Sequence, residues 1–332
     1  MAIGSGIGAS FGMVDESTYG TYVAPTRWLA GTSFMIQPQI VTTPVEGIAA
    51  GRFADPDEVV TGRNGIGQWT GQVPTTKWGL MMKHLFGTTA TPTQQAATAA
   101  YLQTLPFVDT FGKSFTAQVG VPLTTGTVVP YTGTGGKITA CEFSSEVNSP
   151  LTATVDFAFQ NVVDSQSLAA PSYVASSVLN GNGSTIAALT VKQGTYASEA
   201  AVSGIRSASV KIERPVDVER PGIPGAYPEP IMNDKVKVSG TLSPDFLAKA
   251  DFADRFLAHT SPPSLVLQWT GALIASTYHH QLTITMPKVY YREAIPGVDG
   301  PDIIKGSVAF DAFYDATNGL VIGTLMSTDT TV

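Results

Sequence analysis

The sequence predicts a mainly antiparallel β-protein with short flanking helices, built from two similar halves. Apolar and polar residues alternate along many segments, two segments change to helical spacing, and the elements around one helix recur around the other. Alternation with a period of two is the pattern of a strand that buries one face. Of the 332 residues, 43% are hydrophobic, so the chain has enough apolar side chains to fill a core.

The clearest strand is predicted at residues 151–159, where every second residue is apolar and the residues between them are mostly polar. Similar alternation predicts strands at 209–213, 235–239, 265–269, 281–286 and 307–311. The four tryptophans lie within strand or helix patterns and are predicted to be core residues: Trp28, Trp69, Trp78 and Trp269.

A first amphipathic helix is predicted near 75–86. Its apolar residues are spaced i, i+3, i+4, i+7 and i+8 from Trp78 to Phe86, Thr75 or Thr76 is placed to cap its start, and Gly87 ends it. A second helix is predicted near 244–258, with Pro244 at the first helical position. Its apolar stripe consists of Phe246, Leu247, Ala250, Ala253, Phe256 and Leu257.

Each predicted helix follows a long loop, at 42–66 and at 214–232, and then a strand that ends in glycine. These glycines, Gly71 and Gly240, are 169 positions apart. The recurrence predicts a tandem duplication, with a first unit at 1–165, a linker or hairpin at 166–204 and a second unit at 205–332. Long loops of this kind are usually ordered by a partner, which here is expected to be another copy of the chain.

The charge content limits the kinds of partner. Only 14% of residues are charged, against roughly 25% in an average soluble domain. A weakly charged surface suits a protein that is covered by copies of itself, because subunit contacts disfavour desolvated Lys, Glu and Asp. The net charge of −7 argues against tight phosphate-neutralising contact with nucleic acid, although DNA can slide past an acidic wall.

The single cysteine, Cys141, excludes an intrachain disulfide and lies in an alternating strand as a packed residue. The start of the chain lacks the features of a signal peptide, and no apolar run approaches 18 residues. We therefore expect synthesis and assembly in the cytoplasm, without insertion into a membrane.

No enzyme motif meets its structural requirements, so no catalytic, cofactor or metal site is predicted. The glycine-rich start has no strand before it, and Gly112-Lys113-Ser114 lacks the earlier glycine of a phosphate-binding loop. His279 and His280 are adjacent in a strand and point to opposite faces. His84 and His259 are expected at the surface or in capping positions near helix C-termini.

Two stretches resemble the family of phage tail tube proteins. Near the start, residues 11–21 read FGMVDESTYGT and are followed by Ala-Pro-Thr-Arg-Trp-Leu at 24–29. Near the end, LTITMPKV at 282–289, Gly-Pro-Asp at 300–302 and VAFDAFYD at 308–315 resemble the closing strands of the family. The resemblance implies a β-sandwich or split-barrel tail-tube unit with a flanking helix, in the virion of a bacteriophage with a long non-contractile tail.

The resemblance also implies partners. Copies of the chain would form stacked rings around a lumen through which DNA passes without specific binding, together with a tape measure protein and a tail terminator. If the duplication holds, three chains make a ring with pseudo-sixfold symmetry, which is favoured over six chains. The predicted contacts between copies and rings are the charged residues of the two long loops: Arg52, Asp55, Asp57, Glu58, Arg63, Arg214, Asp217, Glu219, Arg220 and Glu229.

Two other functions remain open from the residues alone. A capsid decoration or head-associated structural protein would also be rich in β-structure and self-associating. A carbohydrate-binding or hydrolytic β-sandwich would need clustered exposed aromatic residues or a cleft with paired carboxylates.

Overall fold

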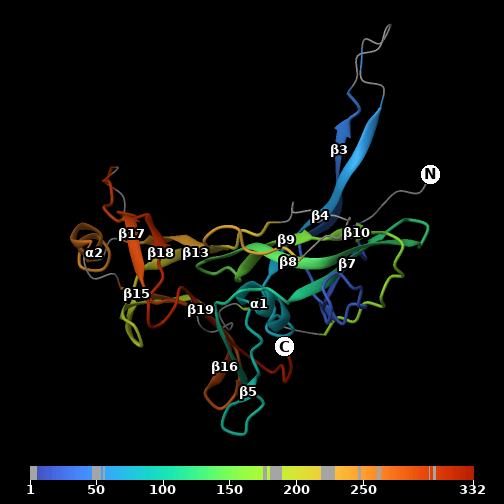
Figure 1. Ribbon diagram of the computed structural model, residues 1–332. Helices are drawn as coiled ribbons and strands as arrows, with labels where there is room; N and C mark the ends of the chain where they lie inside the picture. The colour runs from blue at the N-terminus through green and yellow to red at the C-terminus, as the bar shows by residue number, and fades with distance from the viewer. Residues whose placement is uncertain are drawn as a thin grey trace.

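The computed structural model describes residues 6–46, 54, 57–174, 178–179, 189–217, 229–245, 248–259, 263–298, 300–301 and 304–332. Its strands form antiparallel sheets, with two short helices beside them (Figure 1). This confirms the predicted fold class.

The larger sheet contains a run of strands in the order β17-β18-β14-β13-β8-β9-β4-β3. In chain order these are β3 (Ser33–Pro44), β4 (Glu58–Gln72), β8 (Val128–Glu146), β9 (Thr152–Phe159), β13 (Ile205–Glu213), β14 (Lys237–Pro244), β17 (Val289–Glu293) and β18 (Val308–Ala312). We call this run the main sheet. The first part of β8 also pairs with β7 (Ser114–Pro122) and β10 (Asn161–Val163), and β7 leads on to β1 (Ser10–Glu16) and β2 (Arg27–Trp28).

The second sheet has seven strands in the order β12-β11-β15-β16-β19-β6-β5. They are β5 (Thr93–Gln94), β6 (Tyr101–Pro106), β11 (Leu189–Thr195), β12 (Ser198–Val202), β15 (Ser264–Ala275), β16 (Tyr278–Met286) and β19 (Ile322–Ser327). Both sheets combine strands from the two predicted units, since β13 pairs with β8 and β19 pairs with β6.

The core contains the apolar faces of these strands and helix α1 (Gly79–Phe86), which packs between β8 and the strands β6 and β19. All four tryptophans are buried, as predicted. The rings of Trp69 and Trp78 lie 5.3 Å apart, and the indole N–H of Trp269 donates to Ser145 Oγ at 2.7 Å. The contact of Trp269 therefore links β15 to β8, which are distant in the sequence.

The two helices follow the predictions to different degrees. Helix α1 ends at Gly87, which adopts a left-handed conformation with φ of 74° as predicted, but the helix begins only at Gly79. The predicted start of the second helix at Pro244 is wrong. Pro244 is the last residue of β14 and pairs with Ile205, a position that proline tolerates at a strand end, and helix α2 covers only Ala253–Ala258. Phe246 and Leu247 lie outside the described residues.

The loop predicted at 42–66 is wrong at both of its ends. Strands β3 and β4 continue into it as far as the pair Pro44 and Glu58, and they project from the body as a hairpin arm (Figure 1). The reason is the content of β-branched residues in Val41-Thr42-Thr43 and Val59-Val60-Thr61, which favour extended structure. In the predicted linker, β11 and β12 form a hairpin that belongs to the second sheet.

The main sheet contains the same strand order twice. Strands β3, β4, β9 and β8 are neighbours in that order, and so are β13, β14, β18 and β17, with a helix following β4 in one set and β14 in the other. Gly71 on β4 pairs with Ala153 on β9, and Gly240 on β14 pairs with Phe310 on β18. The two half-sheets meet where β13 of one pairs with β8 of the other.

Candidate assembly surfaces

The two ends of the main sheet are strand edges with unpaired backbone groups. Among the described strands, β3 pairs only with β4, and β17 pairs only with β18. These edges lie at opposite ends of the molecule (Figure 1). An exposed edge of this kind is a template for pairing with another strand.

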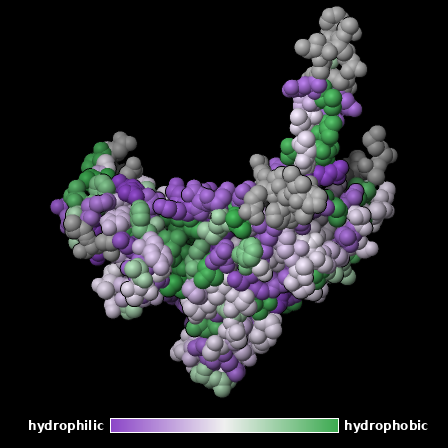
Figure 2. All heavy atoms as spheres, viewed as in Figure 1, coloured by the Kyte–Doolittle hydropathy of each residue, from purple (hydrophilic) through white to green (hydrophobic). Residues whose placement is uncertain are grey.

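One face of the main sheet is polar from edge to edge. A continuous row of paired residues crosses all eight strands: Ser33, Thr70, Thr154, Glu142, Lys211, Ser239, Asp311 and Tyr290. Side-chain hydrogen bonds join neighbouring strands on this face, as between Gln68 Nε2 and Asp156 Oδ1 at 2.8 Å, and between the hydroxyls of Ser209 and Thr241 at 2.9 Å. Figure 2 shows a hydrophilic band along this side of the molecule.

The next row of paired residues points to the opposite side, where most of its side chains are buried: Phe34, Trp69, Val155, Cys141, Ile212, Val238, Ala312 and Val289. Cys141 is fully buried, as predicted, and burial raises the pKa of its thiol. The thiol is therefore a packed group and not an activated nucleophile.

The β3–β4 arm exposes apolar side chains. Ile40 and Val59 are each 54% exposed, and Val41 and Val60 are exposed beside them. An isolated two-stranded hairpin with uncovered apolar residues has little stability of its own in water, so this arm is suited to contact with another surface.

Three of the predicted contact residues lie on the arm. Asp57 and Glu58 are exposed, and Asp57 Oδ1 accepts a hydrogen bond from the backbone N–H of Glu58 at 2.8 Å. Arg63 is exposed on β4, where it pairs with Ile40. Arg52 and Asp55, which belong to the same predicted loop, lie outside the described residues.

The predicted loop at 214–232 is held at both ends by buried charges. At its start, the side chain of Arg214 is completely buried, and its guanidinium donates to the carbonyls of Leu85 at 2.8 Å and Val108 at 2.9 Å. The guanidinium also lies 4.1 Å from the centre of the Phe107 ring. Burial lowers the pKa of Arg214 to about 10, so the group stays charged at neutral pH.

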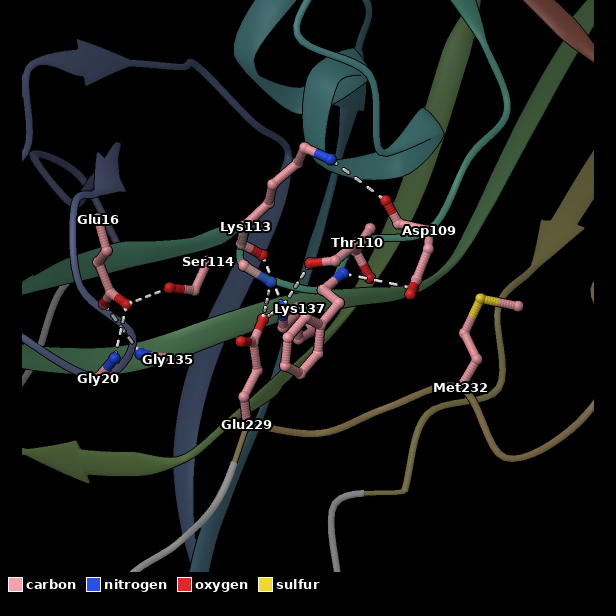
Figure 3. Close-up of polar contacts among 12 residues, drawn as sticks. Glu16, Gly20, Asp109, Thr110, Lys113, Ser114, Gly135, Lys137, Glu229 and Met232 are labelled. Carbon is pink, nitrogen blue, oxygen red and sulfur yellow. Dashed lines mark hydrogen bonds and ion pairs between the residues drawn. The ribbon is translucent and has the colours of Figure 1, made fainter.

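At the other end of this loop, Glu229 pairs with Lys137 (Figure 3). The Lys137 ammonium is buried and also donates to the carbonyls of Thr110 and Lys113, both at 2.7 Å. Glu229 further accepts the N–H of Gly112 at 2.7 Å. Burial lowers the pKa of Lys137, and the pairing with Glu229 opposes this shift.

The side chains of Arg214 and Glu229 thus contact residues of the same chain in this structure. These contacts could not be predicted, because the partner residues are distant in the sequence. Asp217 lies between them, and its backbone N–H donates to the carbonyl of Ile231 at 2.9 Å. Glu219 and Arg220 lie outside the described residues.

Sequence reasoning missed the role of Glu16, which lies in the acidic-Ser-Thr-Tyr-Gly run. Its carboxylate is buried and accepts hydrogen bonds from Ser114 Oγ at 2.7 Å, from Thr116 Oγ1 at 2.8 Å, and from the N–H groups of Gly20 and Gly135 at 2.9 Å (Figure 3). Glu16 therefore connects the turn after β1 to β7 and β8, and the hydrogen bonds to its carboxylate stabilise this part of the fold.

His84, which was expected at the surface or in a capping position, lies in the last turn of α1 but not at the surface. The imidazole is buried, packs 4.9 Å from the ring centre of Phe115, and its Nε2 lies 2.7 Å from Asp15 Oδ1. Lys83 also pairs with Asp15. Burial lowers the pKa of His84, and the contact with Asp15 only partly opposes this.

The described residues contain no group of three or more His, Cys, Asp or Glu side chains placed to hold a metal ion. No helix in the described ranges is long and apolar enough to cross a membrane. The described residues instead present two strand edges, an arm with uncovered apolar residues and a polar sheet face.

The family model described as phage tail tube protein matches residues 6–312. A search of curated proteins finds no match. The matched segment contains the main sheet, both helices and the arm, and it confirms the resemblance seen at the two ends of the sequence. The chain therefore belongs to the phage tail tube protein family and is a structural component of a phage tail.

Proposed function

We propose that copies of this chain join through their sheet edges into rings, and that the rings stack into the tail tube. The observation that carries the proposal is the repeated strand order of the main sheet, which leaves one free edge at β3 and one at β17. Because these edges are different surfaces, pairing β3 of one copy with β17 of the next is a heterologous contact, which generates a ring when its rotation closes.

Three chains make one ring in this proposal, in preference to six. Each chain contributes two half-sheets, which we interpret as a tandem duplication with units at 1–165 and 205–332 joined by the segment 166–204. Three copies then place six similar half-sheets around the axis. The internal joint between β13 and β8 shows a head-to-tail connection that the sheet already makes within one chain.

The polar face of the main sheet lines the lumen in this proposal. It carries hydroxyls, amides and charges of both signs, as the row from Ser33 to Tyr290 illustrates. Because this face mixes charges of both signs and the chain as a whole has a net charge of −7, the face is not suited to neutralise the phosphates of DNA, so the genome passes without specific binding. The tube would then be the conduit for genome ejection from a phage with a long non-contractile tail.

The arm provides the contact between rings. Its uncovered apolar residues and the charged residues Asp57, Glu58 and Arg63 reach away from the sheet body. We also retain Arg52, Asp55, Asp217, Glu219 and Arg220 as proposed contact residues. Assembly in the host cytoplasm, a tape measure protein in the lumen and a terminator at the end of the tube complete the proposal.

Electron microscopy of the purified chain tests this function. Striated tubes or rings with a central hole are expected, and native mass spectrometry of released rings is expected to give three chains. Monomers that persist at high protein concentration over a range of salt and temperature would contradict the proposal. Binding to icosahedral shells without tubes would favour the head-associated alternative, and glycan binding by monomers would favour the carbohydrate-binding one.

A further inference from the structure

We infer that the joint between neighbouring copies has a defined register, in which Ser33 of one copy lies opposite Tyr290 of the next. The inference rests on the proposed ring, and it deepens that ring by naming the strand residues that meet.

The template is the joint inside the chain. There, Lys211 on β13 pairs with Glu142 on β8. The same register continues beyond the strands, where the N–H of Arg214 donates to Thr139 O at 2.7 Å and the N–H of Val147 donates to Arg206 O at 2.8 Å. Hydrogen-bonded and non-hydrogen-bonded pairs alternate along an antiparallel ladder. Since Arg206 and Arg214 bond to β8 through their backbones, the even-numbered residues of β13 form the hydrogen-bonded pairs, and Lys211 with Glu142 is a non-hydrogen-bonded pair.

The residue pairs of the main sheet transfer this register to its free edges. Ser33 pairs with Thr70 on β4 as Lys211 pairs with Ser239 on β14. In the first half-sheet the row of paired residues runs from Ser33 on β3 to Glu142 on β8. In the second half-sheet it runs from Lys211 on β13 to Tyr290 on β17. Tyr290 is therefore equivalent to Glu142. The row that crosses the sheet continues into the next copy when Ser33 meets Tyr290.

The β17 edge is free only in part. The N–H of Val289 already donates to the carbonyl of Pro263 at 2.9 Å. On the β3 side, the N–H of Thr32, which lies opposite Tyr291 in this register, already donates to the carbonyl of Thr70 at 2.8 Å. The joint therefore starts at the carbonyl of Val289 and ends at the N–H of Tyr291, which makes it shorter than the internal joint. Tyr291 is held firmly, since its hydroxyl donates to Gln193 Oε1 at 2.7 Å in the core.

Disulfide trapping tests the register. The double variant Ser33→Cys with Tyr290→Cys is expected to give cross-linked dimers and trimers on mild oxidation, because non-hydrogen-bonded pairs bring Cβ atoms to disulfide distance. The native Cys141 is buried and does not interfere. Ser33→Cys with Arg292→Cys, on the same face but two residues further along, is the matched control and is expected to cross-link at least about fivefold less.

The outcomes separate the register from the ring. Tubes that form normally but give equal or no cross-linking in the two variants would overturn the register and leave the proposed function intact, whereas failure of the wild-type chain to assemble would overturn the function. Tyr290 packs against His259 and Phe313. If its replacement prevents folding, the pair Met35→Cys with Lys288→Cys tests the same register two residues away.

Discussion

Lys137 and Glu229, 92 positions apart in the chain, form an ion pair in which the ammonium is almost completely buried and the carboxylate is 11% exposed. Lys137 lies on β8 in the first half of the chain, and Glu229 begins the segment that leads to β14 in the second half. The pair therefore stabilises the arrangement of the two half-sheets, and it gives the first prediction.

Replacing Glu229 with Ala is expected to destabilise the folded monomer by about 3 kcal/mol, because it leaves a buried ammonium without its counter-charge. Urea unfolding measures this. Glu58→Ala, at an exposed position on the arm, is the matched control and is expected to change the free energy of unfolding by less than about 0.5 kcal/mol. Equal losses in the two variants would contradict the role of the ion pair.

Gly240→Ala is expected to cost about 2 kcal/mol of folding stability by overpacking. A Cβ atom at this position would meet Ser209 O at 2.1 Å and the ring of Phe310 at 2.5 Å. Gly297→Ala is the control, since a Cβ there meets nothing within 4 Å. Thermal unfolding compares the two, and a melting temperature of Gly240→Ala equal to that of the control would refute this account of the β13–β14–β18 packing.

Stability is expected to fall in mild acid because of His84 and Asp15. The folded state lowers the pKa of His84 below 6.5, so the unfolded state binds the proton first, and stability is lost as the pH falls from about 6.5 toward the folded pKa. Burial would raise the pKa of Asp15, but hydrogen bonds from His84 and Lys83 outweigh burial and lower it, which adds a further loss at lower pH.

His84→Gln removes the titrating imidazole. The difference in unfolding free energy between pH 7.5 and pH 5.5 is expected to be smaller in this variant than in the wild-type chain, as measured by denaturant unfolding at both pH values. An unchanged difference would show that His84 does not contribute to the acid sensitivity.

Val59→Asp on the arm is expected to prevent stacking of rings into tubes while rings still form, because the side chain is uncovered in the chain and lies outside the body of the sheet. Electron microscopy measures the ratio of rings to tubes. Val59→Thr keeps the β-branched shape and is expected to retain tubes. Long tubes from Val59→Asp would exclude this part of the arm from the contact between rings.

Local features of the fold were predictable from residue patterns. The alternation at 151–159 correctly predicted a strand and its buried face, because the side chains of a strand point alternately to its two sides. Gly87 correctly predicted a helix end, because a left-handed residue there is a property of one position. The tail tube resemblance was likewise carried by short local stretches.

Features that depend on long-range partners were not predictable. Alternation in β8 and β13 indicates which face is buried but not that these two strands pair, since any strand with an apolar face satisfies the same pattern. His84 was expected at the surface or in a capping position, because no local pattern indicated Asp15, which the fold places beside it from 69 positions away. Pairing, burial and the two free edges are determined by which apolar faces fit together in three dimensions, and this information lies in packing between distant segments and not in the spacing within one of them.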